Sequence, residues 1–134
     1  MKRAEAREQA FILIFENIFN PDVPIDDMKL IAVEEGLFVL DDFAEELVYK
    51  TVENVQQLDV EIAKYLKNWT LSRISRVALA ILRMAFAEIS FFDDVPDKVA
   101  ANEAVELAKK YGADKDPGFI NGVLGSFIKA KNEE

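Results

Sequence analysis

Residues 73–91 read RISRVALAILRMAFAEISF and give the clearest indication of the fold class. Apolar side chains recur in this stretch at intervals of three and four residues, which is the period of an amphipathic α-helix. One face of that helix carries five apolar residues: Ala78, Ile81, Leu82, Ala85 and Ile89. Leu79 and Phe86, seven residues apart, form a second apolar stripe on the same helix. The stretch therefore predicts a long helix with more than one apolar face.

The same period recurs on both sides of this helix, whereas the alternation typical of strands is nearly absent. Prolines and glycines separate the periodic segments and mark the expected helix ends. The helices are expected at residues 3–19, 26–36, 41–66, 73–91, 96–111 and 118–130. We therefore predict an all-α fold, a compact helical bundle of about six to seven helices, in a single domain spanning residues 1–134.

The composition excludes several classes of function. The chain contains neither cysteine nor histidine, so thiolate and imidazole catalysis, zinc sites and haem ligation by histidine are excluded. The acidic residues are spread over solvated helical faces, and no glycine-rich loop accompanies them. We therefore expect a protein that is not an enzyme and holds no metal or cofactor. No apolar run approaches the ~18 residues of a membrane span, so we also expect no contact with a membrane and a cytoplasmic location.

The net charge of −9 conceals an uneven distribution of charge along the chain. Residues 16–62 contain thirteen acidic residues and two lysines, whereas residues 63–92 contain five basic residues and one acidic residue. Residues 1–15 are also slightly basic. Basic zones attract nucleic acid even when the average charge opposes it, so the sequence leaves room for an RNA-binding surface.

Residues 68–124 contain a set of motifs whose order and spacing resemble those of the NusB family. The quoted blocks are Asn68-Trp69-x-Leu71-x-Arg73-Ile74-Ser75, Ile81-Leu82-Arg83-Met84-Ala85, residues 102–112 (NEAVELAKKYG) and residues 119–124 (FINGVL). Near the N-terminus, Ala6-Arg7-Glu8-x-Ala10 also fits the family's first helix. The resemblance implies two three-helix subdomains and implies neither catalysis nor a metal.

The same resemblance implies a bacterial transcription antitermination factor. Such a factor binds boxA-type single-stranded RNA from ribosomal-RNA leader transcripts together with NusE, a small-subunit ribosomal protein. The pair then helps to hold the transcription elongation complex in a processive state. An alternative from a different class is a helical protein–protein adaptor whose RNA binding is weakened or lost. Two features motivate this alternative: the first helix has fewer arginines than is typical of the family, and the net charge is acidic.

The candidate RNA-binding residues are cations and aromatic residues from distant parts of the chain. Cations bind phosphates, and exposed aromatic rings stack on the bases of single-stranded RNA. For Phe15 and Phe119, core packing is the alternative interpretation, and the resemblance favours RNA at Phe119. The full set is Lys2, Arg3, Arg7, Phe15, Arg73, Arg76, Lys115, Phe119 and Asn121.

Residues for protein contacts are expected on the helix of residues 73–91. The resemblance places Ala78 and Leu79 beside the NusE-binding face, and Phe86 continues the stripe of Leu79. This stripe is either part of the core or a surface for a partner or a second copy of the chain. Arg83 lies opposite the main apolar face, and we expect it to form an internal ion pair with an acid such as Glu103 or Glu106.

Overall fold

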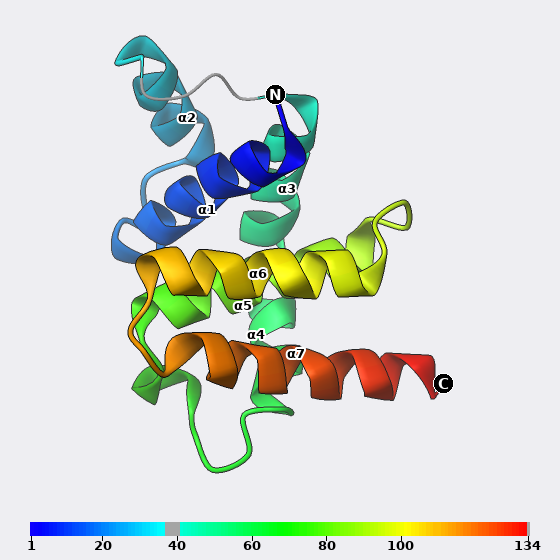
Figure 1. Cartoon of the computed structure of the whole chain (residues 1–134). Coiled ribbons are helices and arrows are strands. Elements are labelled where there is room, and N and C mark those ends of the chain that lie inside the picture. The colour runs from blue at the N-terminus through cyan, green and yellow to red at the C-terminus, as the bar shows by residue number, and fades with distance from the viewer. Residues whose placement is uncertain (37–40, 134) are drawn as a thin grey trace.

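The computed structural model describes residues 1–36 and 41–133, and this part of the chain contains helices and no strands (Figure 1). The all-α prediction is confirmed. In chain order the helices are α1 (Arg3–Phe19), α2 (Ile25–Glu34), α3 (Asp42–Glu53), α4 (Val55–Ala63), the 3₁₀ turn η1 (Leu71–Arg73), α5 (Arg76–Phe91), α6 (Asp97–Tyr111) and α7 (Asp116–Asn132).

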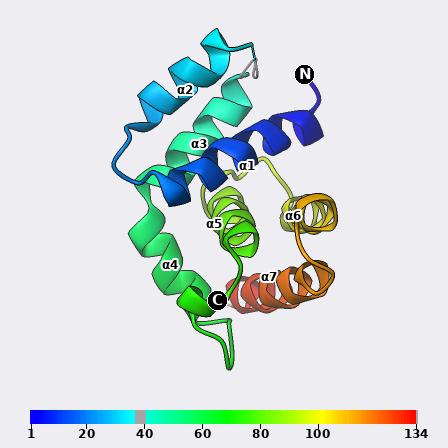
Figure 2. The ribbon, with the colours of Figure 1, turned by 90° about the vertical axis from the view of Figure 1, so that its left-hand side faces the viewer.

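The helices surround α5. Figure 2 shows α5 end-on in the middle of the molecule, with α1 and α3 above it, α4 on one side, α6 on the other and α7 below. Helices α6 and α7 run side by side in opposite directions (Figure 1). The first three helices gather at one end of the molecule, and α5, α6 and α7 form the other group. Helix α4 packs on α5 and joins the second group, so the two subdomains that the family resemblance implied are seen, but with three and four helices in the described part of the chain and not three each.

Several helix ends follow from the local sequence. Helix α1 begins and ends where the apolar period predicts, and Pro21 follows it closely. Gly36, just beyond α2, has a φ of 73°, a left-handed conformation that favours glycine. Asp41 caps α3, because its carboxylate accepts a hydrogen bond from the backbone N–H of Ala44 at 2.8 Å.

The predicted continuous helix from residue 41 to Leu66 is wrong, because the chain breaks at Asn54 into α3 and α4. Asn54 has φ −116° and ψ 20°, outside helical geometry. Its side-chain amide donates a hydrogen bond to the carbonyl of Lys50 at 2.7 Å, the group that the helical backbone would otherwise engage. Asparagine competes with the backbone in this way, and the competition interrupts a helix that its apolar pattern would continue.

Helix α5 is the central element of the core. Eleven of its sixteen residues are buried, which is expected of a helix that neighbours enclose on every side. Arg83 is half-buried, and its guanidinium pairs with the carboxylate of Asp59 on α4 through two contacts of 2.8 Å. The predicted internal ion pair of Arg83 is thus confirmed, but its partner is Asp59 and not Glu103 or Glu106.

Candidate nucleic-acid interface

The turn between α6 and α7 positions Lys115 and Phe119. The Asp116 carboxylate accepts hydrogen bonds from the backbone N–H of Ala113 at 3.0 Å and from the Ser75 hydroxyl at 3.2 Å. The Ser75 oxygen in turn accepts a hydrogen bond from the N–H of Ala78 and so caps α5. One carboxylate therefore ties the start of α7 to the start of α5.

Gly112 allows this turn to close. A Cβ at this position would lie 2.7 Å from the Asp116 carboxylate and 2.8 Å from the backbone oxygen of Ala108. Both distances are below ordinary contact, and the backbone atom is fixed by α6. A side chain at residue 112 would therefore push α6 and the start of α7 apart.

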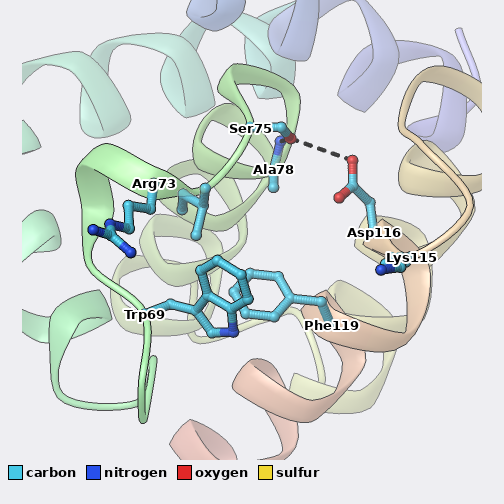
Figure 3. A pocket seen from close by; sticks show the side chains of 8 residues that line it. Trp69, Arg73, Ser75, Ala78, Lys115, Asp116 and Phe119 are labelled. Carbon is cyan, nitrogen blue, oxygen red and sulfur yellow. Dashed lines mark hydrogen bonds between the residues drawn. The ribbon is translucent and has the colours of Figure 1, made fainter.

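A surface hollow opens at this junction, between the segment before α5 and the first turn of α7 (Figure 3). Figure 3 shows the rings of Trp69 and Phe119 together, with Arg73 on one side and Lys115 on the other. The lining residues are Trp69, Arg73, Ile74, Ser75, Ala78, Lys115, Asp116 and Phe119. The fold thus brings three of the predicted RNA-binding residues, Arg73, Lys115 and Phe119, around one hollow.

Trp69 is the lining residue that the sequence interpretation missed. The connection of residues 69–72 was read only as a source of helix caps. Trp69 is 54% exposed, although tryptophan is highly buried on average. The signal was present in the sequence, because the chain's single tryptophan stands in a polar connection next to Lys67 and Asn68.

The electrostatics of the hollow favour an anionic ligand. Arg73 and Lys115 are both exposed basic residues. Asp116 is the single acid among the described lining residues, and its carboxylate is already engaged by Ser75 and Ala113. The hollow thus carries more positive than negative charge in a chain whose net charge is −9.

A second polar cluster at the end of α6 is neutralised internally. Glu8 of α1 accepts hydrogen bonds from the Lys110 ammonium, at 2.6 Å, and from the Tyr111 hydroxyl. The bond from Lys110 is the main reason why the pKa of Glu8 is lowered and that of Lys110 raised. Burial and the bond to Glu8 raise the pKa of Tyr111. This cluster fastens α1 to α6 and leaves little net positive charge for RNA.

Lys2 and Arg3 lie away from the hollow. Both residues are exposed, and the Arg3 guanidinium carbon sits 3.9 Å from the ring centroid of Phe43 on α3. Figures 1 and 2 both place the N-terminus at the top of the molecule, whereas the turn between α6 and α7 lies well below it. The candidate cations therefore do not gather in one place, and RNA contact by Lys2 and Arg3 stays a prediction.

Arg7 contradicts the sequence prediction most clearly. Its side chain is 5% exposed, and its guanidinium holds the carboxylate of Glu88, whose side chain is 2% exposed. The Arg7 Nε atom lies 2.9 Å from Oε1 and 3.0 Å from Oε2, and Nη2 lies 2.6 Å from Oε2. A guanidinium that is buried and doubly paired is not available to an RNA phosphate, so the predicted contact is wrong and Arg7 is a core residue.

Three further candidates stay predictions. Arg76 is exposed at the first position of α5 but does not line the hollow. Asn121 is exposed on α7 and lines a different depression, towards α6. Phe15 is half-buried, and its ring packs between those of Phe11 and Phe19, at centroid distances of 5.9 and 5.1 Å. Phe15 thus packs partly as the core interpretation predicted, although the residue is not fully buried.

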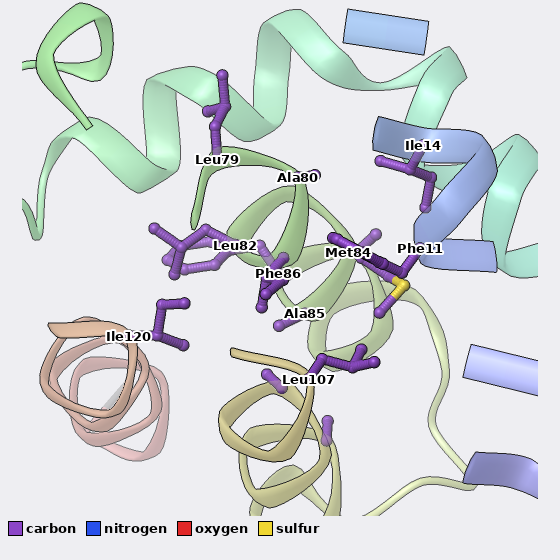
Figure 4. Close-up of a cluster of buried hydrophobic side chains, with 14 of the residues drawn as sticks. Phe11, Ile14, Leu79, Ala80, Leu82, Met84, Ala85, Phe86, Leu107 and Ile120 are labelled. Carbon is purple, nitrogen blue, oxygen red and sulfur yellow. The ribbon is translucent and has the colours of Figure 1, made fainter. Parts of the chain in front are cut away.

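The stripe of Leu79 and Phe86 on α5 is buried, so of the two interpretations the core is confirmed and the partner surface is wrong for the chain as it folds. Leu79 points from α5 towards the segment formed by α3 and α4, and Phe86 lies inside the core (Figure 4). The ring of Phe86 stacks on that of Phe127 with centroids 4.0 Å apart. Ala78 is 1% exposed and lies at the bottom of the hollow. The stripe is core because α5 has neighbours on all sides.

Two other features of the described residues bear on the kind of site. Within residues 1–36 and 41–133, no acidic residues are grouped in threes in a way that would hold a metal ion. In the same part of the chain, none of the helices combines the length and the apolar character needed to cross a lipid bilayer.

Comparison with known proteins identifies the family. Residues 4–129 match the NusB family. The transcription antitermination protein NusB of Natranaerobius thermophilus is 42% identical, with 99% of each chain covered. The Bacillus subtilis protein of the same name is also 42% identical, with 100% of this chain and 99% of that protein covered.

Solved structures agree with the sequence comparison. The structure of NusB from T. maritima has a TM-score of 0.81 and 30% identity, and it covers 96% of this chain and 92% of that one. A crystal structure of the antitermination factors NusB and NusE in complex with dsRNA contains a chain with a TM-score of 0.83 and 27% identity. The alignment covers 97% of this chain and 99% of that one. On its sequence and its fold, the chain belongs to the NusB family.

Proposed function

We propose that this protein is a transcription antitermination factor that binds boxA-type single-stranded RNA together with NusE. In this role it joins the transcription elongation complex and supports processive transcription of ribosomal RNA operons in the cytoplasm. Its contribution is binding and not catalysis. Relatives over nearly the full length are antitermination proteins, and a similar chain has been seen with NusE and RNA.

The observation that carries the proposal is the hollow between α5 and α7. It combines an aromatic ring, Phe119, with two exposed cations, Arg73 and Lys115, that come from segments about 40 residues apart. Single-stranded RNA needs both kinds of partner, because its bases stack on aromatic rings while its phosphates bind cations. The packing of α5 against α7 brings the aromatic ring and the cations together in an otherwise acidic chain.

The salt dependence of RNA binding tests this proposal. The affinity for a boxA-like RNA oligonucleotide would be measured by fluorescence anisotropy over a range of salt concentrations, with and without NusE. For single strands, each phosphate that a cation neutralises contributes roughly −0.7 to the log–log slope. Arg73→Gln and Lys115→Gln should each make the slope shallower by about that amount. Phe119→Leu should weaken binding while leaving the slope unchanged.

A matched control comes from an exposed lysine far from the hollow. Lys98 lies near the start of α6, and the hollow adjoins the turn at the end of the same helix. Lys98→Gln removes the same charge and should leave the affinity and the slope as in the parent protein. Absence of RNA binding by the parent protein, with and without NusE, would contradict the proposal and favour the adaptor function.

A further inference from the structure

Trp69 and Phe119 form a wall that two hollows share. The first hollow contains Arg73 and Lys115, as described above. The second shares only these two rings with the first and is lined by Tyr65, Leu66, Lys67, Asn68, Trp69, Gly118, Phe119, Gly122 and Val123. Each has a volume of about 270 Å³, slightly below the usual range of small-molecule pockets. Such a size suits one flat group on each side of the wall.

The backbone holds Trp69 outward at a conformational cost. Lys67, two residues earlier, has a φ of 58°, a left-handed conformation that side chains other than glycine and asparagine rarely adopt. The N–H of Trp69 donates a hydrogen bond to the carbonyl of Leu66 at 3.2 Å and closes the resulting turn. The turn leaves more than half of Trp69 exposed, although burial of its ring would have stabilised the fold. Strain that exposes an aromatic ring points to a ligand.

The second hollow has an open backbone on its α7 side. Gly118 and Gly122 lie four residues apart and therefore on one face of α7. A Cβ at either position would meet no atom within 4 Å, so internal packing does not require glycine there. Glycine inside a helix is less stable than alanine. Two glycines without a packing role thus leave room for a ligand to approach the helix closely.

The charges around the wall indicate the class of ligand. Lys67 borders the second hollow and Arg73 and Lys115 border the first, while the described lining of the second hollow contains no acid. Asn68 adds an amide that can both donate and accept hydrogen bonds. Flat rings for stacking, cations for phosphate and an amide for a base edge together fit nucleotides.

We propose that Trp69 is a second base-stacking residue of this protein. The hollow of Lys67, Asn68, Gly118 and Gly122 holds one nucleotide of a single-stranded RNA, and the hollow of Arg73 and Lys115 holds another. Stacking on the wall of Trp69 and Phe119 fixes a base on each side. This inference rests on the proposed function, because it assigns a subsite of the same RNA interface.

Trp69 itself provides the readout, because it is the single tryptophan of the chain. A base that stacks on an indole quenches its fluorescence. The parent protein would be titrated with a boxA-like RNA oligonucleotide while indole emission and the anisotropy of a label on the RNA are followed together. The proposal predicts quenching that saturates along the same curve as the anisotropy.

Variants test the energetic contribution of the ring. A stacked base contributes roughly 1–3 kcal/mol, so Trp69→Leu should weaken RNA binding by roughly 5- to 150-fold. Trp69→Phe retains a ring and should lose much less affinity. Leu30→Ala is the matched control, because Leu30 is an apolar residue 55% exposed on α2, at the opposite end of the molecule (Figure 1), and it should bind as the parent does.

Three outcomes would overturn the proposal. Unchanged indole emission during an anisotropy change, together with an affinity of Trp69→Leu within twofold of the parent, shows that RNA binds elsewhere and leaves the proposed function intact. Quenching by NusE alone, with no further change on adding RNA, assigns Trp69 to a protein interface. Absence of any anisotropy change with the parent protein, with and without NusE, removes the proposed function and this subsite together.

Discussion

The ion pair between Arg7 and Glu88 gives the sharpest prediction about the fold. It joins α1 to α5 through three contacts of 2.6–3.0 Å, and the side chains are 5% and 2% exposed. Arg7→Met removes the charged group and keeps an apolar stem of similar length. The carboxylate of Glu88 then stays in the core without a partner and without water.

The structure sets the size of the effect. Removal of one member of a buried ion pair costs about 3–5 kcal/mol, because the remaining charge is desolvated and unpaired. For a chain of this length, such a loss lowers the melting temperature by about 10–20 °C. The double variant Arg7→Met/Glu88→Leu removes both charges and fills the space with apolar groups. It should recover most of the lost stability.

Urea and thermal unfolding, followed by circular dichroism, would measure both variants. Lys109→Met is the control, because it breaks the exposed pair between Lys109 and Glu106 and should cost less than about 1 kcal/mol. The double variant should also bind RNA as the parent protein does, because Arg7 is buried. A loss below about 1 kcal/mol for Arg7→Met would refute the burial argument. Weak RNA binding by a stable double variant would restore Arg7 to the interface.

Three smaller predictions concern the contacts that hold the site in place. Ser75→Ala removes the cap of α5 and its bond to Asp116 and should lower the free energy of unfolding by about 1 kcal/mol, with Ser75→Thr close to the parent in urea unfolding. Gly112→Ala places a methyl group 2.7 Å from the Asp116 carboxylate and should cost about 1–3 kcal/mol; an unchanged urea midpoint would contradict the close approach. Because the pKa of Glu8 is lowered from 4.5, chiefly by the hydrogen bond from Lys110, its contact stabilises the fold above that pH and less as the pH falls below it. The stability difference between the parent and Glu8→Gln should therefore be present near pH 7 and shrink in acid, as thermal unfolding at several pH values would show.

Helix positions could be predicted from the sequence because they depend on local signals. The apolar period and the following proline located α1, and Gly36 marked the end of the second helix. The break at Asn54 could not be predicted from the period, because it depends on one side-chain amide taking over the carbonyl of Lys50. A change of this kind leaves the apolar pattern intact.

The site was harder to predict because it depends on packing between distant segments. Arg7 was placed on the surface, because its partner Glu88 lies 81 residues away and no motif near Arg7 indicates the ion pair. For Leu79 and Phe86 the sequence left the core and a partner surface as alternatives, because only the packing of neighbours around α5 decides between them. Phe119 was favoured through the family resemblance, and Lys115 was added because it precedes Phe119 in the same loop. Trp69 was missed, although an aromatic residue in a polar connection is a signal for a binding surface.

Photo-crosslinking would locate the RNA on the protein most directly. A boxA-like oligonucleotide carrying photoreactive uridines would be irradiated with the protein and NusE, and the crosslinked residues identified by mass spectrometry. The proposed interface predicts crosslinks at Trp69 or Phe119, which are lost when Arg73 and Lys115 are both replaced by glutamine. Crosslinks confined to residues 1–15, with none at either ring, would contradict it.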